Sequence, residues 1–360
     1  MSVLDRYILR SVVGAVALVL LVLLTLAALF LFISQQQEVG TGNYGGLQAL
    51  RFVVLSLPEQ FFEFLPIAAL MGSLIGMGVL AHGSELTVMR AAGISTGRIG
   101  LAMALAGVAI AVVAGLTAEF VAPAAGDMAR TQKALAKFSN ISFAGRGGAW
   151  ARDGRLFVKA EALSPDGALG GITVFALTPD NRLELVGHAR RGAGRAQGGW
   201  ELHGYSESRF IANRIVSVGV PVHHLDTGLS AGFLGLAVAD PSDLSMRELW
   251  RAITYLDANG QDTRSWRYAF WSIAAQVAAI PFAVLLALPF LFGSLRAAGN
   301  GARATLGLVL GLAYFILQRM VASGTIAFQL DPLLLAWLPT AVLALAVAVL
   351  IARMRLTGAA

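Results

Sequence analysis

Long apolar segments joined by short polar connections occupy both ends of the chain. Six of them are long enough to cross the roughly 30 Å hydrocarbon core of a bilayer as helices. They lie near Ser11–Ile33, Phe61–Ala81, Ile99–Val121, Ala269–Phe292, Ala304–Val321 and Pro332–Ile351. A long polar stretch separates the first three from the last three. The pattern therefore predicts an α-helical polytopic membrane protein with a soluble domain inserted between two three-helix halves.

The polar stretch has the periodicity of β-strands. Its short runs are divided by Gly, Asp and Asn turns and read "GRLFVKAEAL", "GITVFALTP", "NRLELVGHA", "GWELHGYSESRF" and "RIVSVGVPV". Successive runs of this kind predict an all-β sandwich or jelly roll. The following segment, Asp243–Gly260, is spaced as an amphipathic helix that ends at a glycine, with Leu249, Ile253 and Leu256 on one face.

The composition agrees with a membrane protein. The patterns divide the chain into four predicted parts. Of the 360 residues 57% are hydrophobic and 13% are charged, whereas soluble domains carry about 25% charged residues. The predicted parts are a first membrane half at 1–135, a β domain at 136–242, a connecting helix at 243–265 and a second membrane half at 266–360.

Arginines beside the apolar segments predict which side of the membrane each connection faces. They gather at four places, which hold Arg6 and Arg10, Arg90 and Arg98, Arg296 and Arg303, and Arg353 and Arg355. With six spans all four places lie on one side, and the positive-inside rule makes that side cytoplasmic. The opposite short connection has Arg51 as its one basic residue. We therefore expect the β domain in the periplasm of a Gram-negative inner membrane.

Several kinds of chemistry find no support in the sequence. There is no cysteine and no glycine-rich phosphate loop followed by Lys and Ser or Thr, so the chain has no ATPase site of its own. Of the five histidines, His223 and His224 are adjacent, which favours a surface loop pair over a metal site. The net charge of +6 does not indicate nucleic-acid binding, because much of the arginine flanks membrane segments. We expect no catalytic residue, metal or cofactor.

The connection "HGSELTVMRAAGIS", His82–Ser95, has the pattern of a short capped helix over 84–93. Ser84 is a suitable N-cap, Glu85 suits the positive helix end, and Gly93 suits the position after the C-cap. About eight residues are marginal as an isolated helix, so the element must dock on something. It either lies on the membrane surface or fits a groove in a cytoplasmic protein, like the coupling helix of an ABC transporter permease. In the second case Glu85 pairs with a base, Leu86 and Met89 fill the groove, and Arg90 lies beside them.

Glycine pairs and outer polar residues each allow two interpretations. Gly72 with Gly76, and Gly307 with Gly311, form G-x-x-x-G motifs that predict close helix packing; a functional seam is the alternative. Five charged residues lie near the predicted outer helix ends, either as interfacial groups that reach water or as polar contacts at the mouth of a cavity. These are Glu59, Glu63, Glu119, Arg319 and Asp331.

Four motifs carry a resemblance to a known family. "LDRYILR", "SELTVMRAAGIS", "EFVAPAAGDMAR" and "FLFGSLRA" resemble, in this order, the lipopolysaccharide-export permeases of the LptF/LptG family. The resemblance covers the whole chain, including the division into three helices, an insert and three helices. "NGQDTRSW" favours the G branch of the family over the F branch.

The resemblance implies a task and a set of partners. Members of the family pair with a sister permease, here LptF, on a dimeric cytoplasmic ATPase, LptB, which binds the ATP. Each permease carries a periplasmic jelly roll. The pair extracts lipopolysaccharide from the outer leaflet of the inner membrane and passes it to a periplasmic bridge. That bridge begins with LptC, whose single helix lies against the first helix of the G subunit.

Two basic residues correspond to substrate-contacting positions of the family. In "GDMARTQKALAK", Arg130 and Lys133 match bases that contact lipid A or core phosphates; ordinary interfacial charge is the alternative. The chain also departs from the family, because Leu31 and Glu38 stand where bases are expected. Two other functions remain open, an ABC permease for drugs, other lipids or lipoproteins, and a membrane scaffold without transport.

Overall fold

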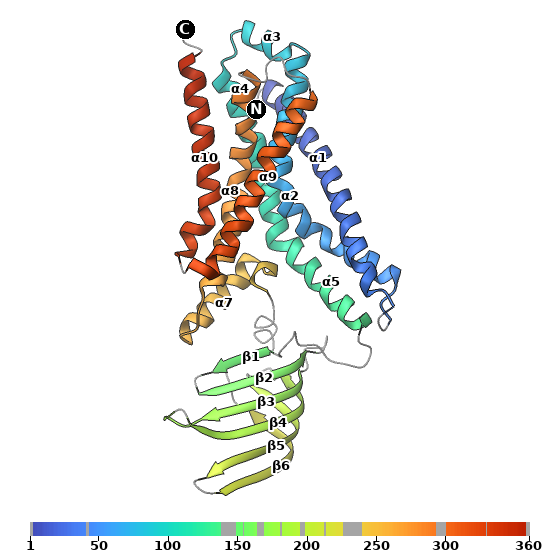
Figure 1. Cartoon of the computed structure of the whole chain (residues 1–360), viewed down its shortest axis with the longest axis vertical. Coiled ribbons are helices and arrows are strands. Elements are labelled where there is room, and N and C mark those ends of the chain that lie inside the picture. The colour runs from blue at the N-terminus through green and yellow to red at the C-terminus, as the bar shows by residue number, and fades with distance from the viewer. Residues whose placement is uncertain are drawn as a thin grey trace.

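The computed structural model describes most of the chain. The described ranges are residues 3–40, 43–137, 149–153, 155–163, 169–180, 182–194, 199–211, 214–225, 240–292, 300–328 and 330–357. Arg296 of the cytoplasmic arginine set lies outside them. Figure 1 shows a long bundle of helices with a β-sheet beyond one of its ends.

Within the part of the chain that the structure describes, six helices are long and apolar enough to cross a membrane, which confirms the predicted number. They are α1 (Val3–Gln35), α2 (Gly46–His82), α4 (Thr96–Leu116), α8 (Arg264–Phe292), α9 (Asn300–Phe328) and α10 (Pro332–Thr357). α4 continues through a π-helical turn, η2 (Thr117–Val121), into α5 (Ala122–Lys137). The predicted start of the second span was wrong, because α2 begins at Gly46 rather than at Phe61. Its first turns are mostly apolar, with Gln48 and Arg51 among them, and the helix as a whole packs against α1 and α5.

α2 is the centre of the bundle. It packs against α1 on one side and against α8 and α9 on others, while α4 packs against both α1 and α8. Fully buried side chains from these helices, among them Leu74, Met77, Ile99 and Met103, form one continuous core. By contrast, α1 and α9 keep many exposed apolar side chains such as Phe30 and Met320, as expected for helices that face membrane lipid or another membrane helix.

The described residues of the inserted domain form a six-stranded antiparallel sheet with its strands in consecutive order. The strands are β1 (Ala149–Asp153), β2 (Leu156–Leu163), β3 (Leu169–Leu177), β4 (Leu183–Gly194), β5 (Trp200–Ile211) and β6 (Arg214–Leu225). All five predicted runs are strands, and β1 was not predicted. A cluster of buried side chains packs on the sheet and includes Trp200, Leu202, Ile172 and Val174. These strands form a meander and do not include a second layer, so the jelly roll stays a prediction.

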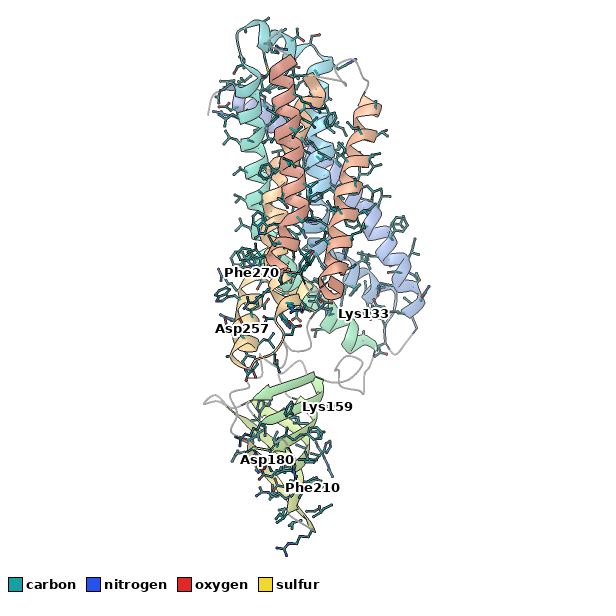
Figure 2. The ribbon with its side chains drawn as sticks, turned by 60° about the vertical axis from the view of Figure 1, so that its left-hand side comes forward. Lys133, Lys159, Asp180, Phe210, Asp257 and Phe270 are labelled. Atoms are coloured by element: carbon teal, nitrogen blue, oxygen red, sulfur yellow. The ribbon has the colours of Figure 1, made fainter. Side chains whose placement is uncertain are left out.

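The connecting helix α7 (Met246–Ala258) joins the insert to α8, as the amphipathic pattern predicted. A capping box starts it, because the Ser245 hydroxyl accepts the Glu248 N–H while Glu248 accepts from Ser245. Leu249 and Ile253 are buried on its inner face, and Gly260 ends it at φ 64°. Figure 2 places Asp257 of α7 between the bundle and the sheet that carries Lys159 and Phe210.

Candidate coupling helix and outer rim

The connection between α2 and α4 forms a short helix, α3 (Glu85–Ala91), at the end of the bundle away from the sheet. Its C-terminus follows the sequence prediction. Gly93 adopts φ 87° and donates its N–H to Arg90, and Ile94 donates to Met89, which together make a Schellman motif. Its N-terminus does not follow the prediction. Ser84 takes the left-handed conformation at φ 60° and its hydroxyl makes no capping bond, because this backbone turns the side chain away from the first N–H groups.

α3 is attached to the bundle by its own apolar side chains. Leu86 is only 4% exposed and belongs to the bundle core, and Met89 is partly buried against the same core. The Arg90 guanidinium lies 5.5 Å from the centre of the Phe292 ring in α8. The hypothesis that Leu86 fills a groove outside the chain is therefore wrong, since that side chain faces inward. The outward apolar residue is Val88, which is 66% exposed.

Two polar contacts connect the start of α1 to this region, and sequence reasoning missed both. The Tyr7 hydroxyl donates to Glu85 over 2.7 Å. The carboxylate of Asp5, a residue only 3% exposed, pairs with Arg98 of α4 at 2.7 Å. In "LDRYILR" the sequence analysis used the arginines and the family resemblance but not Asp5 or Tyr7, although a buried acid at a helix start signals a partner. The start of α1 is thereby joined to α3 by a hydrogen bond and to α4 by an ion pair.

Arg130 and Lys133 lie together at the opposite end of the bundle, the end nearer the sheet, and each has a carboxylate partner. Arg130 pairs with Asp243 at 3.0 Å and stays 41% exposed. Lys133 pairs with Glu38 at 2.7 Å and lies over the Phe52 ring. Burial raises the pKa of Asp243, and the Arg130 guanidinium opposes that shift. The sequence indicated the two bases but not the acids that face them.

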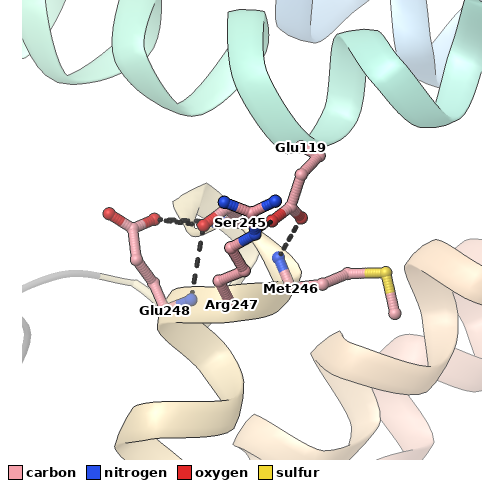
Figure 3. Close-up of polar contacts among 5 residues, drawn as sticks. All are labelled: Glu119, Ser245, Met246, Arg247 and Glu248. Carbon is pink, nitrogen blue, oxygen red and sulfur yellow. Dashed lines mark hydrogen bonds and ion pairs between the residues drawn. The ribbon is translucent and has the colours of Figure 1, made fainter.

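Glu119 joins the third span to the connecting helix (Figure 3). One of its oxygens accepts the Met246 N–H over 3.0 Å, and the other lies 3.0 Å from Nε of Arg247. Glu119 thus supplies negative charge to the positive end of α7 from a different helix. It projects from the π-helical turn η2, a rare geometry frequent at functional sites.

The remaining charges at this end of the bundle include an ion pair, a helix cap and an exposed acid. Glu63 of α2 pairs with Arg319 of α9, and Asp331 accepts the Leu333 N–H at the start of α10. Glu59 is exposed, which fits both the interfacial and the cavity-mouth interpretation.

The glycine motifs lie at close helix contacts, as the packing interpretation predicted. A Cβ added at Gly72 would lie 2.5 Å from Cα of Val16, and one at Gly76 would lie 2.8 Å from the Ser11 carbonyl, both in α1. Gly307 and Gly311 face α2 in the same way. A further contact lay outside any motif, since a Cβ at Gly107 would lie 2.7 Å from Cα of Pro281.

Comparison with known proteins decides the family. The model of the family "Lipopolysaccharide export system permease LptF/LptG" matches residues 6–353. The chain belongs to this family. It is 31% identical to the permease LptG of Escherichia coli K12 over 342 residues, 94% of this chain and 95% of the relative. It is 30% identical to LptG of Haemophilus influenzae over 340 residues, with the same coverage. Both relatives are named LptG, which confirms the G branch.

The permease is therefore a subunit of a lipopolysaccharide export system, and this match favours that function over a lipoprotein or drug exporter and over a scaffold.

Its adjacent histidines lie within strand β6, not in a loop. His223 stacks on Tyr205 with ring centres 4.3 Å apart, whereas His224 is exposed. Among the residues that the structure describes, no three His, Asp or Glu side chains are grouped to hold a metal.

Proposed function

We propose that this permease is the G-type half of an ATP-driven machine that lifts lipopolysaccharide out of the outer leaflet of the inner membrane. An LptF-type permease completes the membrane cavity, a dimeric LptB-type ATPase supplies the energy, and an LptC-type subunit receives the lipid. The observation that carries this proposal is α3, a helix fixed to the bundle core through Leu86 with Val88 exposed. A cytoplasmic partner that displaces such a helix also displaces the bundle to which the helix is attached.

Energy considerations support an external motor. Each buried CH₂ group is worth about 0.8 kcal/mol, so a lipid with several acyl chains resists extraction by tens of kcal/mol if its tails must meet water. The chain has no phosphate-binding loop. A separate ATPase must therefore provide the work, and a displacement of α3 passes to α1 through Glu85 and Tyr7.

Glu85→Lys is expected to weaken ATPase docking by about 1–3 kcal/mol, because it places a positive charge where an acid faces a base of the partner. The measurement is the affinity of the purified ATPase for the permease pair. Tyr7→Phe is the matched control, since it removes the hydrogen bond to Glu85 and keeps the carboxylate. Unchanged affinity with Glu85→Lys, or an equal loss with Tyr7→Phe, contradicts a direct contact between Glu85 and the ATPase.

The proposed orientation places α3 in the cytoplasm and the β domain in the periplasm. Gly97 follows α3 and Asp180 lies in the hairpin between β3 and β4, and both are exposed. Single cysteines at these positions are expected to differ in spheroplasts. A membrane-impermeant thiol reagent should label Asp180→Cys and spare Gly97→Cys until the cells are lysed. Labelling of Gly97→Cys in intact spheroplasts contradicts the orientation.

Arg130→Ala is expected to weaken lipopolysaccharide binding, since a partly desolvated charge-assisted contact to phosphate is worth about 1.5–3 kcal/mol. Arg130→Lys should restore only part of the affinity because it lacks the planar fork. Binding is measured with the detergent-solubilised complex, where a mere headgroup anchor loses its importance. Asp243→Asn removes the same ion pair and keeps the arginine. An equal loss with Asp243→Asn shows that the pair, not phosphate contact, is what matters.

A further inference from the structure

An aromatic cluster lies where the connecting helix α7 meets the first turns of α8. Trp250 of α7 is 61% exposed, and the centre of its ring lies 5.9 Å from that of Phe270 in α8. The Phe270 ring meets Trp271 edge to face, with ring centres 5.3 Å apart. Figure 2 shows Phe270 on the outer side of the bundle, farther from the sheet than Asp257 of α7. The proposed function gives these three rings no role.

The depth of the cluster matches a boundary of the hydrocarbon core. Phe292 ends α8 beside Arg90 of α3, at the end of the bundle away from the sheet. From Phe292 back to Trp271, α8 rises roughly 31 Å at 1.5 Å per residue, and the hydrocarbon core of a bilayer is about 30 Å thick. Trp250 and Phe270 therefore lie where acyl chains give way to headgroups, the depth at which Trp is enriched in membrane proteins.

Two arginines accompany Trp250 on the exposed side of α7. The Arg247 side chain is 70% exposed, with its Nε facing Glu119 and its guanidinium 5.2 Å from the centre of the exposed Phe120 ring. Arg251 is exposed and makes no ion pair within the part of the chain that the structure describes. A tryptophan flanked by exposed arginines is typical of a helix that lies in the membrane interface, with the ring toward the acyl chains and the cations on the headgroups.

The surroundings of the cluster indicate bilayer lipid as its occupant. Phe270 and Trp271 belong to a membrane-spanning helix, and their rings continue onto Trp250 without a break. The cluster is thus an extension of the outer surface of that span. Figures 1 and 2 both place α7 away from the end of α5, where Lys133 lies. The positive charge beside the rings is complementary to anionic headgroups.

We propose that the first two turns of α7 rest on the leaflet nearer the β-sheet and bind an anionic phospholipid. Trp250 lies at the boundary of the acyl chains, while Arg251 and the terminal nitrogens of Arg247 contact the phosphate. Leu249 is buried on the opposite face of the helix, so α7 is held between the bundle and the lipid. This contact sets the height at which the chain leaves the membrane for the sheet. The proposal requires that α8 spans the membrane and is independent of the proposed transport function.

The depth of α7 is tested with a fluorescent label, because the chain has no cysteine of its own. Bimane is attached to Trp250→Cys, or to Ala258→Cys as the matched control on the same exposed face of α7 and nearer the sheet. Each variant is assembled with its partner subunits in nanodiscs whose phospholipids carry brominated acyl chains, and the unaltered complex gives the background. Bromine quenches bimane on contact. We expect quenching of the label at position 250 and little quenching at position 258.

The choice of headgroup is tested by brominating one lipid at a time, phosphatidylglycerol or phosphatidylethanolamine, in nanodiscs that contain both. Phosphatidylglycerol is expected to associate with the labelled position 250 about two- to fivefold more strongly, as for one arginine near an anionic headgroup. Arg251→Gln should remove most of this preference. Arg214→Gln should keep it, because it removes the same charge from an exposed position in the hairpin between β5 and β6.

Three results would overturn the proposal. A label at position 250 that is not quenched shows that water or a partner subunit covers this face of α7. Equal quenching at positions 250 and 258 shows that the first turns do not mark the membrane boundary. A preference for phosphatidylglycerol that is absent, or that Arg251→Gln leaves unchanged, refutes the headgroup contact. Size-exclusion chromatography checks that each variant complex assembles. No readout involves lipopolysaccharide, so failure here leaves the proposed function untouched.

Discussion

Gly72→Leu is expected to separate α1 from α2 and to lower the stability of the permease by more than about 3 kcal/mol. A side chain at this position meets the backbone of α1, since its Cβ would lie 2.5 Å from Cα and 2.7 Å from N of Val16. Backbone atoms cannot rotate aside, so the helices must move apart, and overpacking of this kind costs 1–3 kcal/mol even where side chains can adapt. Thermal unfolding in detergent measures the loss.

Gly14→Leu provides the control for this substitution. Gly14 lies in the same helix pair, on α1, but a Cβ there meets nothing within 4 Å. The added leucine should leave the unfolding temperature unchanged or raise it, because glycine is a poor helix former. Equal destabilisation by the two substitutions contradicts the close packing of α1 on α2.

Leu86→Asp is expected to abolish ATP-driven transport, because it puts an unpaired carboxylate where the side chain is 4% exposed and removes the apolar attachment of α3. Burial of an unpaired charge and the resulting cavity together should cost more than about 3 kcal/mol. Val88→Asp is the contrasting variant, since Val88 is 66% exposed. It should leave the unfolding temperature of the permease unchanged and weaken binding of the ATPase.

These two variants assign the two faces of α3. Leu86→Asp with an unfolding temperature equal to that of the unaltered permease shows that Leu86 is not held in the core. Val88→Asp with normal ATPase binding shows that the exposed face of α3 is not the docking surface, and the surface-lying alternative then holds.

The helices and strands could be predicted from the sequence because their signals are local. Apolar length gave the six spans, and alternation gave five strands, since each depends on residues close in sequence. The start of α2 could not be predicted in this way. Arg51, Pro58 and Glu59 interrupt the apolar run before Phe61, whereas in the structure one helix continues through all three and packs against α1 and α5.

The roles of individual side chains were harder to predict, because they depend on neighbours that are distant in sequence. The sequence indicated Leu86 and Met89 for a partner's groove, and only the arrangement of α3 on the bundle shows that Leu86 faces inward while Val88 is exposed. In the same way the sequence indicated Arg130 but not its partner Asp243, which is brought close by the turn before α7. Gly93 could be predicted because a left-handed C-terminal position is a local requirement of the helix.

The most direct test of the central claim is lipopolysaccharide release from proteoliposomes. The permease is reconstituted with its sister permease, the ATPase and the bridge subunit, and transfer of lipopolysaccharide to the bridge subunit is followed by crosslinking. The account predicts transfer that requires ATP and this permease, and that falls with Val88→Asp while the unfolding temperature is unchanged. ATP-independent transfer, or equal transfer without this permease, would contradict the account.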